Sequence, residues 1–491
     1  MTRIVKWAWV SFGVFLMGTA SEGAAPAPSR QGEALYKEQC SICHGAEGKG
    51  DGSAAEFLFP KPRNFTTGTF KVRSTPSGSP PTDQDLLNTV TQGMPGSAMP
   101  GFSFLSKGDR LALVSHVKRL ANLQEKPEGT IAVSSPPAAT PETLAQGKKL
   151  YREMKCWECH GDEGRADGPS TGTLKDDSGE AILANDFTRG IYKGGGTLSD
   201  IVFRFATGMD GTPMPSYEDS LKEPERWALA RYVKSLAGPK VAVQPTTGTV
   251  VVKRVSGPVP TDTMDPAWGK VPAVPVPLML LWQRNEAAAD EVSVKALHNG
   301  KEIALLLEWK DEEVSTRFRR DRHFADAAAV MFSLAPQVPL SRQAHFAMGE
   351  KKKPVNIWYW ALDRRMDLVG VEPPVQPAFA RGPALVAGWG SGNAASVPLR
   401  PSAIVEDLNA EGFGTLTAQP RADQNVNGSG FYAAGRWRVV FTRDLRSRGA
   451  LDAPLEPGRA IPVAFAVWNG SAEDRDGQKA VSTWYRLVLA R

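Results

Sequence analysis

Cysteine is scarce in this 491-residue sequence: there are four, and all of them lie in two five-residue segments. No cysteine is therefore left for disulfides elsewhere in the chain. A formal net charge of +5 is small for this length, and no basic cluster is interleaved with aromatic residues, which argues against a nucleic-acid-binding protein. No apolar run is long enough to cross a bilayer comfortably. The length itself predicts about three domains.

The N-terminus has the pattern of an export signal. Two basic residues precede an apolar run from Trp7 to Gly18, and small residues follow it. This run is too short for a membrane anchor, so the pattern predicts a signal peptide over residues 1–25, with cleavage at Ala20 or at Ala25 left open. We therefore expect the mature protein in the periplasm.

Both cysteine-containing segments, Cys40–His44 and Cys156–His160, have the form Cys-x-x-Cys-His, which is the attachment sequence of c-type haem. On a short helical turn the two cysteines lie on one face, so both sulfurs reach one porphyrin edge, and the histidine places an imidazole beneath the iron. A zinc site would have to join cysteine pairs 116 positions apart, and a disulfide in so short a loop would be strained. The sequence thus predicts two covalent haem c groups, attached through Cys40, Cys43, Cys156 and Cys159, with His44 and His160 as proximal iron ligands.

Residues 31–123 and 143–237 are two copies of one unit. The dipeptides Gln-Gly and Leu-Tyr precede the haem motif in both copies, and a matching apolar segment closes each copy at an offset of 116 residues. Because the haem motifs have the same offset, we expect the copies to stay in register over their length. The pattern resembles small class I cytochromes c, in which one helix leads into the haem motif and another closes the domain. We place cytochrome c domains at 26–123 and 143–237, with linkers at 124–142 and 238–248.

A methionine from the late loop of each copy is expected to be the sixth iron ligand, because a neutral thioether favours reduced iron. The candidates are Met94 and Met99 in the first copy and Met209 and Met214 in the second. Only the second methionine of each loop is followed by a proline in both copies, and the fixed φ of that proline helps to hold the loop. We therefore choose Met99 and Met214. His116 stands where the second copy has a tyrosine, so we interpret it as a packing residue. An iron with both axial positions filled has no open site for a substrate. We therefore predict that the two domains are electron carriers and not peroxidases.

From about residue 249 the sequence changes to short apolar runs separated by turn residues, which is typical of a β-sandwich. Asn299-Gly300, between two such runs, is a strong hairpin signal. Residues 370–400 are rich in proline and glycine and are expected to form a long surface loop. The predicted strands are 249–255, 292–298, 301–309, 328–334, 355–362, 437–442, 462–468 and 481–489. The predicted fold class is thus multidomain, with two small all-α cytochrome c domains followed by an all-β sandwich at 249–491.

Three parts of this third domain carry a family resemblance. They are Phe346–Glu350 with Pro354–Trp360, Gly435–Phe441, and Val463–Gly470 with Asp476–Tyr485. They resemble the haem b-binding γ subunits of periplasmic molybdenum oxidoreductases, the group of ethylbenzene and dimethylsulfide dehydrogenases and selenate and chlorate reductases. The resemblance implies one haem b held between a methionine and a lysine, which correspond to Met348 and Lys479. Met331 and His345 are rivals to Met348.

The resemblance also implies a function. Such γ subunits pass electrons between the iron–sulfur subunit of a molybdopterin enzyme and a periplasmic cytochrome or other carrier. The two c-type domains depart from the single-domain members, and the nearest whole-chain likeness is to γ-like subunits of nitrite oxidoreductases. We therefore predict a three-haem relay that is no enzyme on its own and associates with membranes through its partners.

Two other hypotheses stay open at this point. One is a dihaem cytochrome tethered to a carbohydrate- or ligand-binding sandwich, with Trp358, Tyr359 and Trp360 as a stacking face. Strand alternation weakens that platform, because it places Tyr359 on the opposite side from the two tryptophans. The other is an enzyme in its own right, such as a peroxidase.

Overall fold

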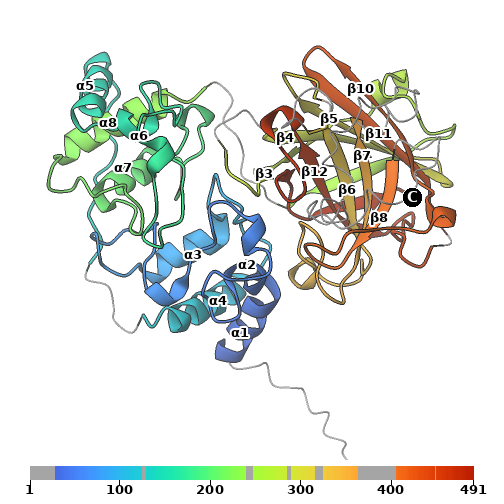
Figure 1. Cartoon of the computed structure of the whole chain (residues 1–491), viewed down its shortest axis with the longest axis horizontal. Coiled ribbons are helices and arrows are strands. Elements are labelled where there is room, and N and C mark those ends of the chain that lie inside the picture. Colours follow the sequence, from blue (N-terminus) through green and yellow to red (C-terminus); the bar gives the residue numbers. More distant parts are fainter. Residues whose placement is uncertain are drawn as a thin grey trace, which may run out of the picture.

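The computed structural model describes residues 28–123, 129–238, 247–284, 289–315, 324–362, 405–447 and 449–491. The predicted signal peptide and the predicted loop at 370–400 lie outside these residues. Figure 1 shows two small helical domains, the first in blue and the second in teal to green, and a large β domain in yellow to red. Within the described part of the chain, no helix has the length and apolar character that a bilayer span needs.

The two helical domains contain the same kinds of elements in the same order, and we call them copy one and copy two. Copy one contains α1 (Pro28–Gln39), α2 (Ser41–His44), the 3-10 helices η1 (Ala55–Phe57) and η2 (Phe65–Thr67), α3 (Asp83–Gln92) and α4 (Lys107–Leu120). Copy two contains α5 (Pro141–Glu153), α6 (Trp157–His160), η3 (Thr171–Thr173), η4 (Phe187–Arg189), α7 (Leu198–Thr207) and α8 (Glu223–Ser235). The predicted helical fold of both copies is confirmed.

A glycine lets the first and last helices of each copy touch. A Cβ atom on Gly32 would lie 2.1 Å from the carbonyl oxygen of Ala112 in α4. A Cβ atom on Gly147 would lie equally close, 2.1 Å, to the carbonyl oxygen of Ala228 in α8. The Gln-Gly dipeptide that marks the repeat is therefore a packing requirement, because only a residue without a side chain allows this backbone contact.

The prediction that the copies stay in register over their length is wrong. The offset is 116 at the haem motifs, 122 at η2 and η4, 115 at α3 and α7, and 116 again at the closing helices. Copy two has an insertion before η4, and copy one has an insertion before α3. The two insertions compensate each other in length. The haem motifs and the closing helices therefore have the same offset, and a comparison of these two segments did not reveal the insertions.

The β domain consists of two sheets that pack face to face and share strand β1. The strands are β1 (Thr249–Arg254), β2 (Val274–Pro277), β3 (Met279–Leu280), β4 (Glu291–His298), β5 (Glu302–Lys310), β6 (Ala327–Ser333), β7 (Val355–Ala361), β8 (Val405–Ala410), β9 (Thr417–Ala418), β10 (Asn427–Ala433), β11 (Arg436–Asp444), β12 (Ala460–Trp468), β13 (Ala480–Val481) and β14 (Tyr485–Leu489). Their order is β10-β11-β5-β4-β1-β14-β12-β6-β7-β8-β9. The start of β1 pairs in parallel with β14 and its end pairs in parallel with β4. This confirms the predicted all-β domain.

The sheet that contains β14, β12, β6, β7 and β8, called the second sheet, is buried on both faces. Along β6, Val330 and Phe332 point into the core between the sheets, whereas Ala329 and Met331 point to the outer face. The outer face carries its own apolar cluster, against which Ile42 of copy one packs. Strands buried on both faces have nearly continuous apolar sequences, as β6 and β12 do. Copy one therefore covers the outer face of this sheet.

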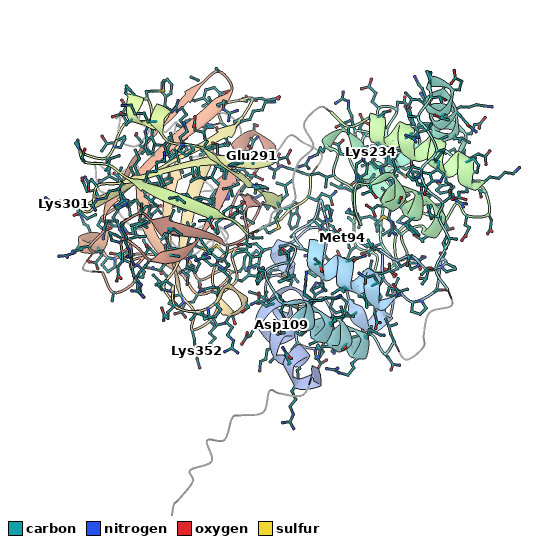
Figure 2. All side chains as sticks on the ribbon, turned by 180° about the vertical axis from the view of Figure 1, so that it is seen from behind. Met94, Asp109, Lys234, Glu291, Lys301 and Lys352 are labelled. Atoms are coloured by element: carbon teal, nitrogen blue, oxygen red, sulfur yellow. The ribbon has the colours of Figure 1, made fainter. Side chains whose placement is uncertain are left out.

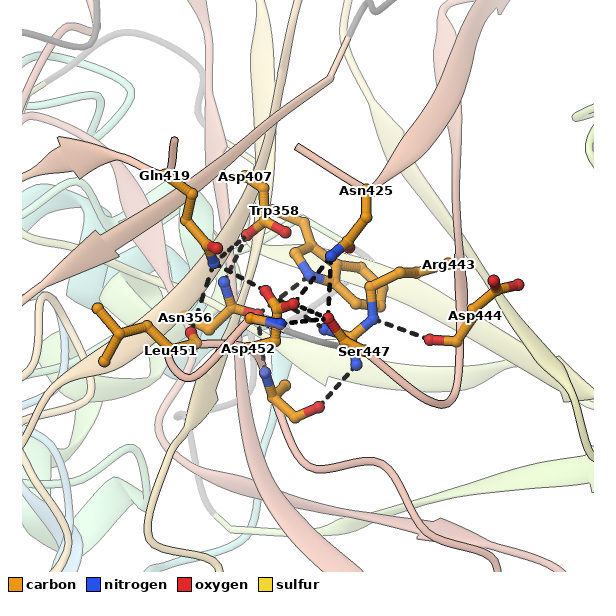
Figure 3. Close-up of polar contacts among 12 residues, drawn as sticks. Asn356, Trp358, Asp407, Gln419, Asn425, Arg443, Asp444, Ser447, Leu451 and Asp452 are labelled. Atoms are coloured by element: carbon orange, nitrogen blue, oxygen red, sulfur yellow. Dashed lines mark hydrogen bonds and ion pairs between the residues drawn. The ribbon is translucent and has the colours of Figure 1, made fainter. Parts of the chain in front are cut away.

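Most of the predicted apolar strands are confirmed, but the predicted strand 481–489 is divided into β13 and β14, and the apolar strand β2 was not predicted. The hairpin at Asn299-Gly300 is confirmed, since Gly300 has φ +88° and joins the antiparallel strands β4 and β5. Strand β8 was not predicted because its sequence is polar, yet Asp407 within it is fully buried. Figure 3 shows how Asp407 is held: Asn356 and Gln419 donate hydrogen bonds of 2.5 and 3.1 Å to its carboxylate.

The tryptophans of the proposed stacking face lie inside the domain. Trp358 and Trp360 are 0% and 1% exposed in the core between the two sheets. Tyr359 lies on the opposite side of β7 and packs against the outer apolar cluster. These residues therefore form no exposed aromatic surface for a sugar.

Candidate haem-binding sites

Helix α2 is a single turn that places the haem motif of copy one at a cavity lined by Cys40, Cys43 and His44. The Nδ1 atom of His44 is 2.9 Å from the carbonyl oxygen of Arg63. Since a carbonyl only accepts, Nδ1 carries the proton and Nε2 keeps its lone pair for a metal. Burial lowers the pKa of His44, and Phe65 stacks on its ring with centroids 4.4 Å apart. The neutral, oriented imidazole suits a proximal iron ligand.

Copy two repeats this arrangement with different residues. The Nδ1 atom of His160 is 3.0 Å from the carbonyl oxygen of Asn185, and Phe187 stacks on the ring at 4.3 Å. Burial lowers the pKa of His160 to about 4. The hydrogen bond from the histidine Nδ1 is accepted by a backbone carbonyl, which every residue has. The accepting residue can therefore be an arginine in one copy and an asparagine in the other.

Each cysteine pair spans one helical turn. The amide of Cys43 donates to the carbonyl of Cys40 at 3.2 Å, and the amide of Cys159 donates to that of Cys156 at 3.4 Å. No disulfide joins these cysteines. Burial raises the pKa of the Cys40, Cys43 and Cys156 thiols to about 12. This is the local geometry that the attachment motif predicts.

The loop that carries the two methionines closes on itself in both copies. The amide of Met94 donates to the carbonyl of Met99 at 3.0 Å, and the amide of Met209 donates to that of Met214 at 3.1 Å. Met94 and Met99 both line the cavity of copy one, while Met214 packs against the apolar cluster of copy two. Figure 2 places Met94 on the side of copy one that faces copy two. The choice of Met99 and Met214 stays a prediction.

Three cations gather where the cavity of copy one meets copy two. Arg63 and Lys71 of copy one and Lys193 of copy two all line this cavity. Burial lowers the pKa of Lys193 to about 8, and burial together with the charges of Arg63 and Lys193 lowers the pKa of Lys71 to about 8. The Nη2 atom of Arg63 is buried and has no hydrogen-bond partner among the described residues. A partly buried cation set of this kind, facing a cavity, fits the two propionate carboxylates that a haem brings.

These cations were missed in the sequence. Lys71 and Lys193 occupy equivalent positions, directly after Phe70 and Tyr192, but the shifted offset of 122 hides the correspondence. An alignment that allowed for the insertions would have revealed the pair.

A second cavity lies on the outer face of the second sheet, and Met348 and Lys479 both line it. The Nζ atom of Lys479 donates a hydrogen bond to Sδ of Met348 at 3.3 Å. The side chains come from the loop before β7 and from the residue before β13, 131 positions apart. Lys479 is 5% exposed and Met348 is 7% exposed. The fold thus brings together the two residues that the family resemblance indicated.

Lys479 lies where a positive charge is unfavourable. Burial lowers its pKa to about 8, opposed by the charge of Asp476. The ring of Trp468, whose centroid lies 5.0 Å from Nζ, is the aromatic contact of this amine. Its hydrogen bond goes to a thioether and not to a carboxylate, although buried lysines are usually paired with one. A neutral amine has a lone pair for a metal. An amine and a thioether in contact inside an apolar cavity therefore fit the axial ligands of a haem iron.

The two rivals of Met348 lie in different places. Met331 reaches the second cavity from β6 and stays a rival. His345 instead lines the cavity of copy one, where burial lowers its pKa to about 4 and its Nδ1 accepts a hydrogen bond from the amide of Ala347 at 3.3 Å. The structure therefore separates His345 from the Met348 site.

Comparison with known protein families assigns each unit. Residues 265–371 and 397–480 match the family described as ethylbenzene dehydrogenase. Residues 144–237 match the family described as cytochrome c. Residues 27–117 match the family described as cytochrome c oxidase, cbb3-type, subunit III.

Three curated proteins are similar to this chain. A putative respiratory nitrate reductase haem subunit of Haloferax mediterranei is 27% identical over 46% of this chain and 68% of its own length. The chlorate reductase subunit γ of Ideonella dechloratans is 26% identical, over 45% of this chain and 76% of its own. The dimethylsulfide dehydrogenase subunit γ of Rhodovulum sulfidophilum is 29% identical, over 45% and 72%.

Two solved structures also show a likeness. A chain of the reducing HAO-like protein complex of Kuenenia stuttgartiensis is 44% identical, covers 42% of this chain and 96% of its own, and has a TM-score of 0.42. A family 9 carbohydrate-binding module of Caldicellulosiruptor kristjanssonii is 10% identical, covers 50% and 96%, and has a TM-score of 0.27. With TM-scores this low, neither likeness supports a conclusion about fold or function.

The helical copies and their haem motifs define the class of this protein: it is a multidomain cytochrome c. More particularly, it joins two N-terminal cytochrome c domains to a haem-binding domain of the ethylbenzene dehydrogenase type, and its relatives include γ subunits of chlorate reductase and dimethylsulfide dehydrogenase. The two cysteine pairs imply two haem c groups, and cytochrome c domains imply a location outside the cytoplasm.

Proposed function

We propose that this protein is a three-haem electron-transfer subunit of a periplasmic molybdenum oxidoreductase complex. Two haem c groups and one haem b relay electrons between the iron–sulfur subunit of the complex and a periplasmic carrier. The catalytic partner is of the nitrite oxidoreductase type, and the chain has no substrate chemistry of its own. Residues 1–25 direct export to the periplasm.

The contact between Lys479 and Met348 is the observation that carries this proposal. A buried lysine costs free energy unless its charge is lost or paired, and here its hydrogen-bond partner is a sulfur. An iron centre would take up both the amine and the thioether and so account for their burial. A haem bound there supplies a one-electron redox centre beside the two c-type motifs of the same chain.

Each residue of the three sites has a role in the proposal. His44 and His160 bind iron through Nε2 and are oriented by the carbonyls that hold Nδ1. Met99 and Met214 would supply the second protein ligand of each haem c iron, and Met348 and Lys479 would hold the third iron. With two protein ligands for every iron, this assignment would leave no position for a substrate. This supports a relay and not a peroxidase.

The haem content of the full chain tests the proposal. Protein from a host competent in cytochrome c maturation should give two haem c and one haem b in a pyridine haemochrome spectrum. Lys479→Gln and Met348→Leu should each lose haem b and keep both haem c groups. Lys351→Gln, at an exposed lysine of the same domain, is the matched control and should keep all three.

Two results would contradict this. A fully loaded protein with c-type bands alone would exclude the haem b centre. Retention of haem b with unchanged ligand-field bands in Met348→Leu, but not in Met331→Leu, would move the axial ligand to Met331.

The partners are tested separately by purification of the native protein. The proposal expects an iron–sulfur subunit and a molybdopterin subunit to purify with it, identified by mass and by iron and molybdenum content. A protein that purifies without a metal-containing partner would restrict the function to that of a free electron carrier.

A further inference from the structure

A five-residue segment of the β domain, Ala344–Met348, separates the two cavities, and we call it the partition. Ala344 and His345 line the cavity of copy one, whereas Ala347 and Met348 line the second cavity. Phe346, at the centre, lines both. A single aromatic side chain is therefore a wall shared by a c-type haem pocket and the Met348–Lys479 site.

The backbone of the partition is fixed at several points. The indole Nε1 of Trp484 donates to the carbonyl of Ala344 at 2.7 Å. The amide of Gly349 donates to the carbonyl of His345 at 2.9 Å, and the amide of Gly412 donates to that of Met348, also at 2.9 Å. A segment held in this way keeps Phe346 in one position relative to both cavities.

Copy one contributes to the second cavity from the other side. Phe57 in η1 lines that cavity and stacks on Phe413 with ring centroids 5.0 Å apart. The amide of Phe59 donates to the carbonyl of Leu281 at 3.0 Å, and the amide of Gln283 donates to the carbonyl of Phe59 at 2.7 Å. Copy one is thus joined to the edge of the β domain by backbone pairing as well as by apolar contact.

The opposite side of copy one meets copy two. A Cβ atom on Gly96, in the methionine loop of copy one, would lie 3.6 Å from Ile191 and 3.9 Å from Asn185. Asn185 is the residue whose carbonyl orients His160. Lys193 of copy two lines the cavity of copy one. The two c-type sites are therefore neighbours, with the methionine loop of one against the histidine side of the other.

Copy two meets the β domain in a different way. Arg189 forms an ion pair with Asp290, and their side chains are 24% and 36% exposed. Figure 1 shows copy one lying against both other units. A partly exposed ion pair holds domains weakly, whereas copy one is held by aromatic stacking and by buried apolar residues such as Leu58, which belongs to the outer apolar cluster of the second sheet.

We propose that copy one holds the middle redox centre, and that electrons pass between the Met348–Lys479 site and copy two through it, across Phe346. This deepens the function proposed above and rests on it. The step moves one electron: the donor iron goes from ferrous to ferric and the acceptor iron from ferric to ferrous, with no bond made or broken. It makes copy two the end of the chain that exchanges electrons with the periplasmic carrier.

Magnetic coupling between the oxidised haems tests this order without any catalytic assay. Cys156→Ala/Cys159→Ala should remove the haem of copy two and leave the relaxation of the haem b electron spin as fast as in the full protein. Cys40→Ala/Cys43→Ala should remove the middle haem and slow that relaxation severalfold, because the nearest paramagnetic neighbour is gone. Fast relaxation that survives loss of the copy one haem, and disappears with the copy two haem, would overturn the order.

A second measurement covers the case in which Cys40→Ala/Cys43→Ala does not fold. In the fully loaded protein, Phe346→Leu should slow electron equilibration between haem b and haem c severalfold after a reducing laser flash, with the midpoint potentials kept. Phe431→Leu is the matched control, since Phe431 on β10 is 42% exposed and lines neither cavity. Equal rates in Phe346→Leu and the parent protein would remove Phe346 from the path.

The outcomes also separate this inference from the proposed function. Loss of the haem b signal in the unaltered protein contradicts the proposed function itself. A normal haem b signal that responds to the copy two haem and not to the copy one haem contradicts the order alone.

Discussion

Copy one and copy two have the same fold and the same haem motif, yet their surroundings differ. The histidine is stacked, hydrogen bonded and made neutral in the same way in both. Copy one lies between two other units, and its cavity is completed by residues from each, such as Lys193 and Trp484. Copy two packs around its own apolar cluster. The two copies therefore share the environment of the proximal histidine. They differ in the outer surfaces that contact the other units, and these contacts decide where each haem site lies relative to the others.

The insertions explain how two similar domains became one unit. Arg73, in the insertion of copy one, forms an ion pair with Asp210 of copy two at 2.7 Å. Asp177, in the insertion of copy two, reaches Arg63 of copy one at 3.5 Å. Each copy thus extends a loop that the other lacks, and these loops form the contact between them. Mutation of a shared feature should have an effect of the same kind in both copies, whereas mutation of a copy-specific feature should not.

The largest expected effect is at the contact between the copies. Arg73 is 1% exposed and also donates to the carbonyl of Thr207 at 2.7 Å. Arg73→Ala should cost about 3 kcal/mol, because it leaves Asp210 without its cation. Calorimetry of the holoprotein should then show the copies unfolding in separate transitions.

Lys49→Ala is the control for this change, since Lys49 pairs with Glu47 on the exposed surface of copy one. It should leave the unfolding profile unchanged. One cooperative transition in Arg73→Ala, at the parental temperature, would show that the insertions do not couple the copies.

The next effect tests the shared helix crossing. Gly32→Ala and Gly147→Ala should each destabilise their own copy by about 1–3 kcal/mol through overpacking against a backbone carbonyl. Gly147→Ala should be the worse, because its Cβ would also lie 2.8 Å from the Cβ of Tyr232, whereas the Gly32 Cβ would lie 3.4 Å from that of His116.

The free energy of unfolding of both variants is measured by denaturant titration, monitored through the absorption band of each haem. Gly172→Ala is the control, because a Cβ there meets nothing within 4 Å. If Gly32→Ala were neutral, the two copies would differ in the packing that their common sequence pattern implies.

The pH dependence of stability, expressed per pH unit, distinguishes the β domain from both copies. Burial raises the pKa of Asp407 to about 8, so the folded state keeps a proton that the unfolded chain releases above pH about 4. Stability should fall as the pH rises between these values, by at most about 1.4 kcal/mol per unit. Asp407→Asn mimics the protonated form and should flatten this slope, as measured by urea unfolding at pH 5 and pH 8. A steeper slope in the variant would reverse the assignment.

The smallest effect concerns the cations between the copies. Lys193 adds positive charge to the cavity of copy one, which favours the reduced iron. Lys193→Gln should lower the midpoint potential of one haem c by roughly 40 mV, which corresponds to about 1 kcal/mol of lost stabilisation of the reduced iron for one electron. Spectroelectrochemistry should show this shift, and Lys234→Gln on the exposed face of α8 should not. Equal shifts in the two variants would mean that Lys193 acts only through net charge.

The local features of this protein could be predicted from the sequence. A haem motif needs two cysteines and a histidine on one turn, so Cys40–His44 and Cys156–His160 determine their own geometry. The Asn299-Gly300 hairpin and the apolar strands likewise follow from short-range preferences and side-chain alternation. Polar strand β8 escaped prediction because Asp407 is buried through hydrogen bonds that come from distant residues.

The long-range features depended on the tertiary structure. Met348 and Lys479 could be named from a resemblance, but their 3.3 Å contact depends on how the loop before β7 and the start of β13 pack on the second sheet. The shared wall at Phe346 and the middle position of copy one have no signature in the sequence, and the equivalence of Lys71 and Lys193 shows only when the insertions are allowed for. The physical reason is that motifs encode the geometry of neighbouring residues, whereas the distance between two pockets is set by which surfaces bury each other when the domains fold together.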